Sequence, residues 1–496
     1  MNGKYLRYMQ QNRKKIAVSI VILVFLIVLG IAILPTKLPR TSPTTQSNNT
    51  IKSNNTIYVA GDGSGDFNCH GSNDQVEINQ ALTYVAENPQ FTTVHLKGPN
   101  TYIISDSIFI GSNTVLEGDP TAVIKLEDKA DWPSAKPLIT QIDRNGINGV
   151  TIKGFEIDGN HDKNEDRRNG EGYYNMIYFF WSKNIQVHDL YMHDGNGDGL
   201  RIEGSYNIQF YNNSIYKLGH DGLFVINSEN VEAWNNRITC RTDSGLRAGD
   251  SNRVKFHDNV IDSFYNWSAG GPGIQIEKSK GIVNDVDVYN NTIHNTYGPG
   301  IWLIGFGEDY PKEEAKNVHI HNNIFYSTGT NPSIDWVGGI VTSGFYDTLI
   351  ENNVFDSVYN AAITNIYPPV STGVDPGIDL SPKGKGYTTI VRNNIIVNTQ
   401  RRTKDPSGTG SGVINYYPAT SSFVLENNCL YNNVGGNYIN STSKTDIYAD
   451  PLFVDQQNHD YHLKSSSPCI GTGYPSSDSS SKNMKNDNRV NIGKYS

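Results

Sequence analysis

The sequence is poor in cysteine and in charge, and it has no basic excess. Its cysteines, Cys69, Cys240, Cys429 and Cys469, have no Cys-x-x-Cys spacing, so neither a cysteine-based zinc site nor a thioredoxin-like motif is indicated. Cys240 is expected to be a small buried residue, whereas Cys429 and Cys469 could pair in an oxidising environment. Only 18% of the residues are charged and the net charge is −9, which argues against a nucleic-acid partner. Frequent Gly (47), Tyr (29) and Asn-Asn pairs suit an extracellular, β-rich protein.

One long hydrophobic run is present, at residues 16–34. It has 19 residues without a charge, and at about 1.5 Å rise per residue it nearly spans a hydrocarbon core of roughly 30 Å. The basic residues before it predict a cytoplasmic segment at residues 1–15. No small-x-small cleavage site follows Leu34, so a single-pass anchor is favoured over a signal peptide. The rest of the chain is then outside, beginning with a Ser/Thr/Asn-rich linker at residues 35–56.

An internal repeat is the strongest feature of the chain. The segments NIQVHDLYM, NIQFYNNSI, NVEAWNNRI and RVKFHDNVI begin at Asn184, Asn207, Asn230 and Arg253, each 23 residues after the last. Later copies continue the pattern at spacings of 30 to 41 residues. Apolar and polar residues alternate in each copy, which indicates a strand with one buried face. Asn-Asn follows, and asparagine both tolerates the left-handed conformation of a sharp bend and can stack as an amide ladder.

A second strand lies between these copies, as in GDGLRIEGS, HDGLFVINS and DSGLRAGDS. Two or three short strands per 23 residues predict an all-β, right-handed parallel β-helix, a solenoid. The expected organisation is an N-terminal cap with first strands at 57–112, the β-helix at 113–470 and a closing segment at 471–496. Helical periodicity over residues 74–86 predicts one short helix that covers the open core of the first coil.

Equivalent positions in successive coils lie about 5 Å apart, so a column of the repeat becomes a row in space. The columns around the Gly-Leu step bring acidic and basic residues together. The candidate catalytic residues are Asp198, His220, Asp221 and Asp243. Paired carboxylates on neighbouring coils suit glycosidic cleavage, in which one protonates the leaving oxygen and the other activates water or attacks.

The candidate substrate-binding residues come from the same rows. Arg201 and Arg247 suit bidentate binding of a uronate carboxylate, and the aromatic faces of Phe224 and Trp302 suit sugar rings. The full set is Arg201, Glu203, Phe224, Arg247, Gln275, Glu277 and Trp302. Asp and His beside Gly are also ordinary turn residues of such a solenoid, and this interpretation stays open.

A long insertion at residues 158–172 lies next to the regular coils and is expected to wall a cleft. Its Asp158, His161, Asp162, Glu165 and Asp166 could bind a cation such as calcium. Their spacing does not match an EF-hand, so a solvated turn is the favoured interpretation. No other cofactor or metal is indicated.

The opening GDGSGDFNCHGSNDQVEINQAL resembles that of pectate-lyase-like β-helix proteins. The later GPGIQIEKS, VYNNTIHNTYGPGIWLIGFG and VHIHNNIFYSTGTNP resemble the disaggregatase and disaggregatase-related family of methanogenic archaea, over roughly residues 57–470. The resemblance implies a cell-surface enzyme that depolymerises a chondroitin-like matrix polysaccharide. No short catalytic motif of that family transfers by residue.

We therefore expect a membrane-anchored enzyme with an acidic polysaccharide as its partner, and hydrolysis is favoured over lyase chemistry. Two alternatives remain. The run His220-Asp221-Gly222-Leu-Phe-Val225 resembles the active-site coils of alginate epimerases, which implies uronate C5-epimerisation. A non-catalytic surface or adhesion rod is the other. The oligomeric state is left open.

Overall fold

The computed structural model describes most of the chain beyond the linker. The described residues are 55–133, 135–164, 174–240, 243–262, 271–305, 311–331, 337–365, 386–401, 409–475 and 489–494. The predicted anchor at 16–34 and its cytoplasmic segment lie outside them. In the part that the structure describes, no helix is long and apolar enough to cross a membrane.

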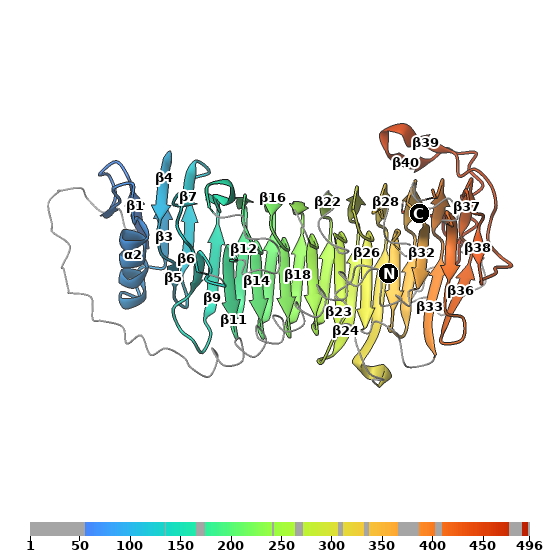
Figure 1. Cartoon of the computed structure of the whole chain (residues 1–496), viewed down its shortest axis with the longest axis horizontal. Coiled ribbons are helices and arrows are strands. Elements are labelled where there is room, and N and C mark those ends of the chain that lie inside the picture. Colours follow the sequence, from blue (N-terminus) through green and yellow to red (C-terminus); the bar gives the residue numbers. More distant parts are fainter. Residues whose placement is uncertain are drawn as a thin grey trace, which may run out of the picture. The chain divides into compact units, whose positions relative to one another are not determined.

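Three parallel sheets wind the described chain into a solenoid, and successive coils follow one another from α2 (Gln75–Glu87) to β38 (Figure 1). Sheet A contains β1 (Thr56–Ala60), β2 (Phe67–Asn68), β3 (Thr93–Leu96), β6 (Val115–Gly118), β9 (Asn148–Lys153), β12 (Lys183–His188), β15 (Tyr206–Tyr211), β18 (Glu229–Trp234), β21 (Asn252–His257), β24 (Val283–Tyr289), β27 (Ala315–His321), β30 (Thr348–Glu351), β33 (Tyr387–Arg392) and β36 (Ser421–Glu426). Sheet B contains β4 (Asn100–Ile104), β7 (Ala122–Leu126), β10 (Glu156–Asp158), β13 (Tyr191–His193), β16 (Ser214–Leu218), β19 (Arg237–Cys240), β22 (Val260–Asp262), β25 (Thr292–His294), β28 (Ile324–Tyr326), β31 (Val354–Asp356), β34 (Ile395–Val397) and β37 (Cys429–Tyr431). Sheet C contains β5 (Ile108–Ile110), β8 (Ile139–Gln141), β11 (Ile177–Phe180), β14 (Leu200–Glu203), β17 (Leu223–Ile226), β20 (Leu246–Gly249), β23 (Ile274–Lys278), β26 (Ile301–Gly305), β29 (Ile340–Ser343), β32 (Ala361–Asn365), β35 (Ser411–Asn415) and β38 (Tyr438–Ile439).

The repeat aligns in space as its spacing predicts. Ile185 pairs with Ile208, Ile208 with Val231, and Val231 with Val254, so residues 23 apart become cross-strand neighbours. These apolar side chains point inward and are almost fully buried, while the residues between them point outward. The alternating pattern therefore builds one continuous core of stacked aliphatic rows, which is the predicted parallel β-helix.

The two asparagines of each Asn-Asn pair have different structural roles. The first, as in Asn212 and Asn235, adopts positive φ (55° and 53°) at the bend. The second is buried: Asn236 donates from Nδ2 to Asn259 Oδ1 at 2.9 Å and to the Phe210 carbonyl at 2.9 Å. Both predictions for asparagine, the left-handed bend and the amide ladder, are thus confirmed, but they fall on neighbouring residues.

A helix covers the first coil, and a small antiparallel pair packs on the outer face of sheet B near the last coils (Figure 1). At the first coil, α2 buries Ile78, Leu82 and Val85, as predicted for a capping helix. At the last coils, the antiparallel pair β39 (Phe453–Asp455) and β40 (Asp460–Leu463) joins a small separate core. That core contains Cys429 and Cys469, which are free thiols in this structure, as is the buried Cys240.

Candidate active site

The predicted catalytic residues lie at the corner where the chain passes from sheet B to sheet C. A column of polar residues runs along this corner. Asn175 Oδ1 accepts from the backbone N–H of Asp198 (3.0 Å), Asp198 Oδ1 from that of Asp221 (3.0 Å), and Asp221 Oδ1 from that of Ser244 (2.7 Å). Because each carboxylate satisfies a backbone donor of the next coil, Asp198 and Asp221 are fully buried.

His220 joins three carboxylates. Its Nδ1 lies 2.5 Å from Asp198 Oδ1 and 3.1 Å from Asp221 Oδ2, and its Nε2 lies 3.4 Å from Asp243 Oδ2. The two buried carboxylates therefore hold one edge of the imidazole, and the other edge meets the more exposed Asp243. A buried carboxylate behind a histidine fixes the ring and stabilises its cation, the same logic as in a catalytic triad.

Arg247 closes this network from the next coil. Its Nη1 lies 3.6 Å from Asp221 Oδ2 and 3.5 Å from Asp243 Oδ2, and its Nη2 lies 2.9 Å from Glu277 Oε2. His220 and Arg247 thus both contact Asp221 and Asp243, so positive and negative groups alternate around a ring. Gln275 extends the network, since it donates from Nε2 to Glu277 Oε2 at 2.9 Å.

The predicted sugar platforms are not open surfaces. Phe224 is buried, and its ring is covered by Arg201 and Arg247, whose guanidinium carbons lie 4.9 and 4.2 Å from the ring centroid. Trp302 is buried as well, one strand beyond Gln275. Neither ring therefore offers an open aromatic face in this structure, and the contact of Phe224 and Trp302 with sugar rings stays a prediction. Phe224 instead spaces and supports the two arginines by cation–π contact.

Arg201 and Glu203 lie on the upstream side of the cluster. Arg201 Nη1 is 3.7 Å from Asp198 Oδ2. Glu203 is reached through Tyr178, whose hydroxyl donates to Glu203 Oε2 at 2.7 Å, while the Arg201 guanidinium carbon lies 5.9 Å from the centroid of the Tyr178 ring. The sequence therefore placed both residues near the site, and Tyr178 links them.

The pKa values of the cluster separate its acids. Burial alone would raise the pKa of Asp198, but the charges of His220 and Arg201 outweigh it and lower that pKa. Burial raises the pKa of Asp221 to about 6, against the pull of His220 and Arg247. Burial would lower the pKa of His220, but Asp221 and Asp198 together raise it well above its usual value. At neutral pH the buried core of the site therefore keeps a proton on His220, whereas a pKa of about 6 leaves Asp221 mostly ionised.

Exposure divides the same residues into two groups. The side chains of His220, Arg247 and Asp243 are 11%, 17% and 20% exposed, whereas those of Asp198 and Asp221 are fully buried. Only the first group, with Arg201, can meet a ligand directly in this conformation. Asp198 and Asp221 can act on a ligand only through His220 and Arg247.

Sequence reasoning missed Asn175 and Tyr178. Asn175 stands 23 residues before Asp198 and Tyr178 stands 23 before Arg201, so the period itself holds the signal. The insertion at 158–172 interrupts the repeat just upstream and hides the register of this coil. Both residues continue the columns that the later coils define.

The calcium hypothesis for the insertion is tested only at its first residues, because residues 165–173 lie outside the described part. Asp158 Oδ2 lies 2.5 Å from Lys125 Nζ, and Asp158 Oδ1 accepts from the backbone N–H of Asn160 at 2.7 Å. His161 lies beside Asp162. The Lys125 ammonium thus already forms an ion pair with Asp158, which disfavours a calcium ion at this carboxylate.

Three stacked parallel sheets with a polar row at one corner define the class of the protein. Residues 139–325 match the family model of the right-handed β-helix region, which confirms the handedness of the predicted solenoid. Residues 283–488 match the family model described as disaggregatase related, so the resemblance stated from the sequence is confirmed over that segment.

Solved structures agree on the fold. The A-module of the mannuronan C-5 epimerase AlgE6 of Azotobacter vinelandii is 16% identical with a TM-score of 0.55, covering 78% of this chain and 98% of the module. The Streptococcus pneumoniae surface adhesin PfbA is 14% identical with a TM-score of 0.50, covering 78% and 96%. The tailspike of E. coli bacteriophage HK620 is 14% identical with a TM-score of 0.50, covering 75% and 64%. No curated protein matches the chain. At such identities the likeness concerns the fold alone, which enzymes and adhesins share.

Proposed function

We propose that this protein is a polysaccharide-degrading enzyme that hydrolyses glycosidic bonds of a uronic-acid-containing, chondroitin-like polymer. One observation carries the proposal: a proton-holding histidine, clamped by two buried carboxylates, presents its outer nitrogen 3.4 Å from the more exposed carboxylate of Asp243. Glycosidic cleavage uses an acid and a carboxylate on either side of the scissile bond, and these two groups are in contact in this structure, so the sugar has to enter between them.

The proposed roles follow burial. His220 protonates the leaving glycosidic oxygen from Nε2, and Asp243 either activates a water molecule or attacks the sugar carbon. Asp198 and Asp221 are positioning residues, because they are fully buried and act through the imidazole. Arg247 and Arg201 bind the uronate carboxylate, with Phe224 holding them apart.

The charge state of His220 favours hydrolysis over β-elimination. Elimination from a uronate needs a base to remove the proton next to the carboxylate. His220 has a pKa well above its usual value, so at neutral pH its ring is already protonated and cannot serve as that base. A protonated histidine instead suits donation to a leaving oxygen, which both hydrolytic schemes require.

The substrate class rests on the two arginines and on the disaggregatase-related match at residues 283–488. We also propose that the enzyme acts outside the cell while anchored through residues 16–34. Extracellular protease applied to intact cells tests the topology: the β-helix should be released, and its complete protection would contradict the anchored, outward-facing arrangement.

The activity test uses full-length protein, kept in detergent because of the apolar run at 16–34, and a chondroitin-like uronate polysaccharide. We expect new reducing ends, shorter chains and no absorbance from unsaturated uronate. Absorbance from unsaturated uronate would show a lyase. An altered uronate composition at unchanged chain length would show an epimerase. Unchanged polymer by all three readouts would leave a binding or adhesion rod.

A further inference from the structure

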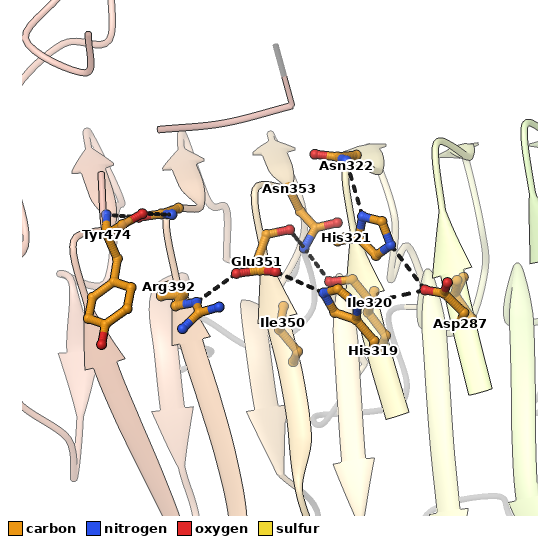
Figure 2. A network of polar contacts seen from close by, with 12 residues as sticks. Asp287, His319, Ile320, His321, Asn322, Ile350, Glu351, Asn353, Arg392 and Tyr474 are labelled. Carbon is orange, nitrogen blue, oxygen red and sulfur yellow. Dashed lines mark hydrogen bonds and ion pairs between the residues drawn. The ribbon is translucent and has the colours of Figure 1, made fainter. Parts of the chain in front are cut away.

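A second cluster of histidine and carboxylate lies on the outer face of sheet A, on strands that the candidate active site does not use. His319 and His321 are two residues apart on β27, so their side chains point to the same face. Asp287 on β24 pairs in register with His319. Figure 2 shows the three side chains converging, with Glu351 and Arg392 behind His319.

The atoms of this cluster are spaced as metal ligands are. Asp287 Oδ1 lies 3.0 Å from His321 Nε2 and 3.8 Å from His319 Nδ1. One ligand atom from each of the three residues lies within 4.8 Å of the other two. Around a tetrahedral zinc ion with bonds of about 2.1 Å, neighbouring ligand atoms are about 3.4 Å apart. The imidazoles of His319 and His321 are stacked, with ring centroids 4.0 Å apart, so the two rings have to rotate before both nitrogen lone pairs meet one ion.

His319 is already oriented for this role. Its Nε2 lies 2.9 Å from Glu351 Oε1, and Arg392 Nε donates to Glu351 Oε2 at 2.6 Å. Because Arg392 holds the Glu351 carboxylate as an acceptor, His319 donates to it from Nε2, and Nδ1, facing Asp287, keeps its lone pair. This is the carboxylate–histidine–metal arrangement found around many metal ions.

Two other clusters with the same residue types differ in one respect. In the cluster of Asp158, His193 and Asp194, the carboxylate of Asp158 is paired with Lys125. In that of Asp198, His220 and Asp221, Arg247 and Arg201 stand beside the carboxylates. Among the described residues, the ion pairs of Asp287 are with the two imidazoles. No lysine or arginine of the described residues lies within ion-pair distance of Asp287, although Lys255 on β21 is its register neighbour.

The cluster also borders a groove. A hollow of about 480 Å³ on this face is lined by Asp287 and His319 together with Lys255, Arg253 and Asn317. The side chains of His319 and Asp287 are 36% and 35% exposed, so a metal there would have protein ligands on one side and solvent on the other. Three protein ligands with an open position characterise zinc sites that bind a further molecule.

We propose that Asp287, His319 and His321 form a binding site for Zn²⁺ or a similar divalent transition metal, with an open coordination position facing the groove. Two imidazoles and one carboxylate suit such metals better than calcium or magnesium, which prefer oxygen ligands. Asn322, which donates from Nδ2 to His321 Nδ1 at 3.1 Å, turns its amide on binding so that its oxygen accepts from that nitrogen.

The test is zinc binding by the full-length protein. After chelator treatment, the protein is dialysed against Zn²⁺ and the bound metal is measured per chain; a competing chelator gives the affinity. We expect one zinc ion per chain, and loss of that ion in His319→Gln and in His321→Gln. Co²⁺ in place of Zn²⁺ should give visible absorption from the same site.

The matched control is His257→Gln. His257 belongs to the same row of stacked rings as His321 and faces Glu232 and Asp258, but it has no second histidine beside it. This variant should keep the zinc. Glu351→Gln should keep all three ligands yet weaken the affinity by about 10- to 100-fold, as for other outer carboxylates of metal sites.

Absence of stoichiometric zinc in the unaltered protein would overturn the proposal. Equal zinc binding by His321→Gln and His257→Gln would overturn it as well, because the metal would then be held elsewhere. Unfolding curves of each variant show that lost binding is not lost fold. The outcome is independent of the proposed hydrolysis, since the active-site residues lie at the corner between sheets B and C.

Discussion

Two regions of one solenoid use histidine and aspartate in opposite ways. In the coils of Asp198, His220 and Arg247, the 23-residue period is unbroken and the charged groups are withdrawn into the corner, where each is paired. In the coils of Asp287 and His319 the spacing is longer and the groups lie on an open sheet face. The proposed acid–base role uses the buried, paired groups, whereas the proposed metal site uses the groups on the open face. The two proposals therefore assign different roles to the same residue types according to their burial.

The largest expected effect is on turnover. His220→Gln removes the proposed acid while keeping similar bulk, and should lower cleavage of a uronate polysaccharide by about 10²- to 10⁴-fold. His321→Gln, on the open face, should leave cleavage within about two-fold, because no step of hydrolysis is assigned to it. Initial rates of reducing-end formation measure both. An equal loss of cleavage rate in His220→Gln and His321→Gln would contradict the assignment of catalysis to the corner region alone.

The next effect is on stability. Arg247→Met leaves Asp221, Asp243 and Glu277 without their shared cation, and should cost about 3–5 kcal/mol of unfolding free energy. The control is Arg253→Met on the open face, where the ion pair with Glu229 is half exposed. That change should cost no more than about 1 kcal/mol. Urea unfolding of each variant decides, and a similar small cost for both would contradict the tightly paired corner.

A third effect is on pH dependence. The folded-state pKa of Asp221 is raised to about 6 from 3.8, so the folded state holds this proton more tightly than the unfolded chain. Stability from this group is therefore present below pH 3.8 and lost as pH rises towards 6. The size is about 2–3 kcal/mol, since each pKa unit corresponds to about 1.4 kcal/mol.

Asp221→Asn should remove this loss, so the variant should gain stability relative to the parent between pH 4.5 and pH 7, within the window set by a pKa of about 6. His220 has a raised pKa too, and its contribution is lost only above its usual pKa of 6.5, outside most of this window. Denaturant unfolding at the two pH values measures the difference. If the unfolding free energy changed between pH 4.5 and pH 7 by the same amount in the parent and in Asp221→Asn, the assignment would be contradicted.

The smallest effects separate the two asparagine rows. Asn291→Ala removes a buried amide that bonds Asn323 Oδ1 and the Phe256 carbonyl, and should cost about 1–3 kcal/mol. Asn235 lies in the exposed row and donates to Asn212 Oδ1 at 2.6 Å. Asn235→Gly, which keeps the positive φ accessible, should cost less than about 1 kcal/mol. Thermal or urea unfolding measures both losses of stability. A larger loss in the exposed-row variant than in Asn291→Ala would show that the exposed asparagines, not the buried ones, contribute most to stability.

The fold was predictable because it repeats. A single period fixed which residues pair, and the column of Asp198, Asp221 and Ser244 followed from it directly. Burial was not predictable in the same way. The period places Arg201 and Arg247 on either side of Phe224, but it does not say that the rings of Phe224 and Trp302 are buried.

The proposed metal site of Asp287, His319 and His321 also contains contacts that the sequence does not reveal. His-x-His on a strand is visible in the sequence, but Asp287 is 32 residues before His319, outside the regular spacing. The contact between His319 and Glu351 is diagonal, since His319 pairs with Leu349, whereas Glu351 and Arg392 are register neighbours; a column alignment reveals only the second contact. Long insertions of variable length thus hide register, whereas exact repeats expose it.

The central claim is that the outer edge formed by His220, Asp243 and Arg247 cleaves a uronate polysaccharide. The most direct measurement compares the full-length protein and its Asp243→Asn variant on one such polymer, before and after chemical reduction of the polymer's carboxylates. The account predicts cleavage of the native polymer only, abolished in the variant although its fold is intact. Cleavage that survives in Asp243→Asn, or that is as fast on the reduced polymer, would contradict the account.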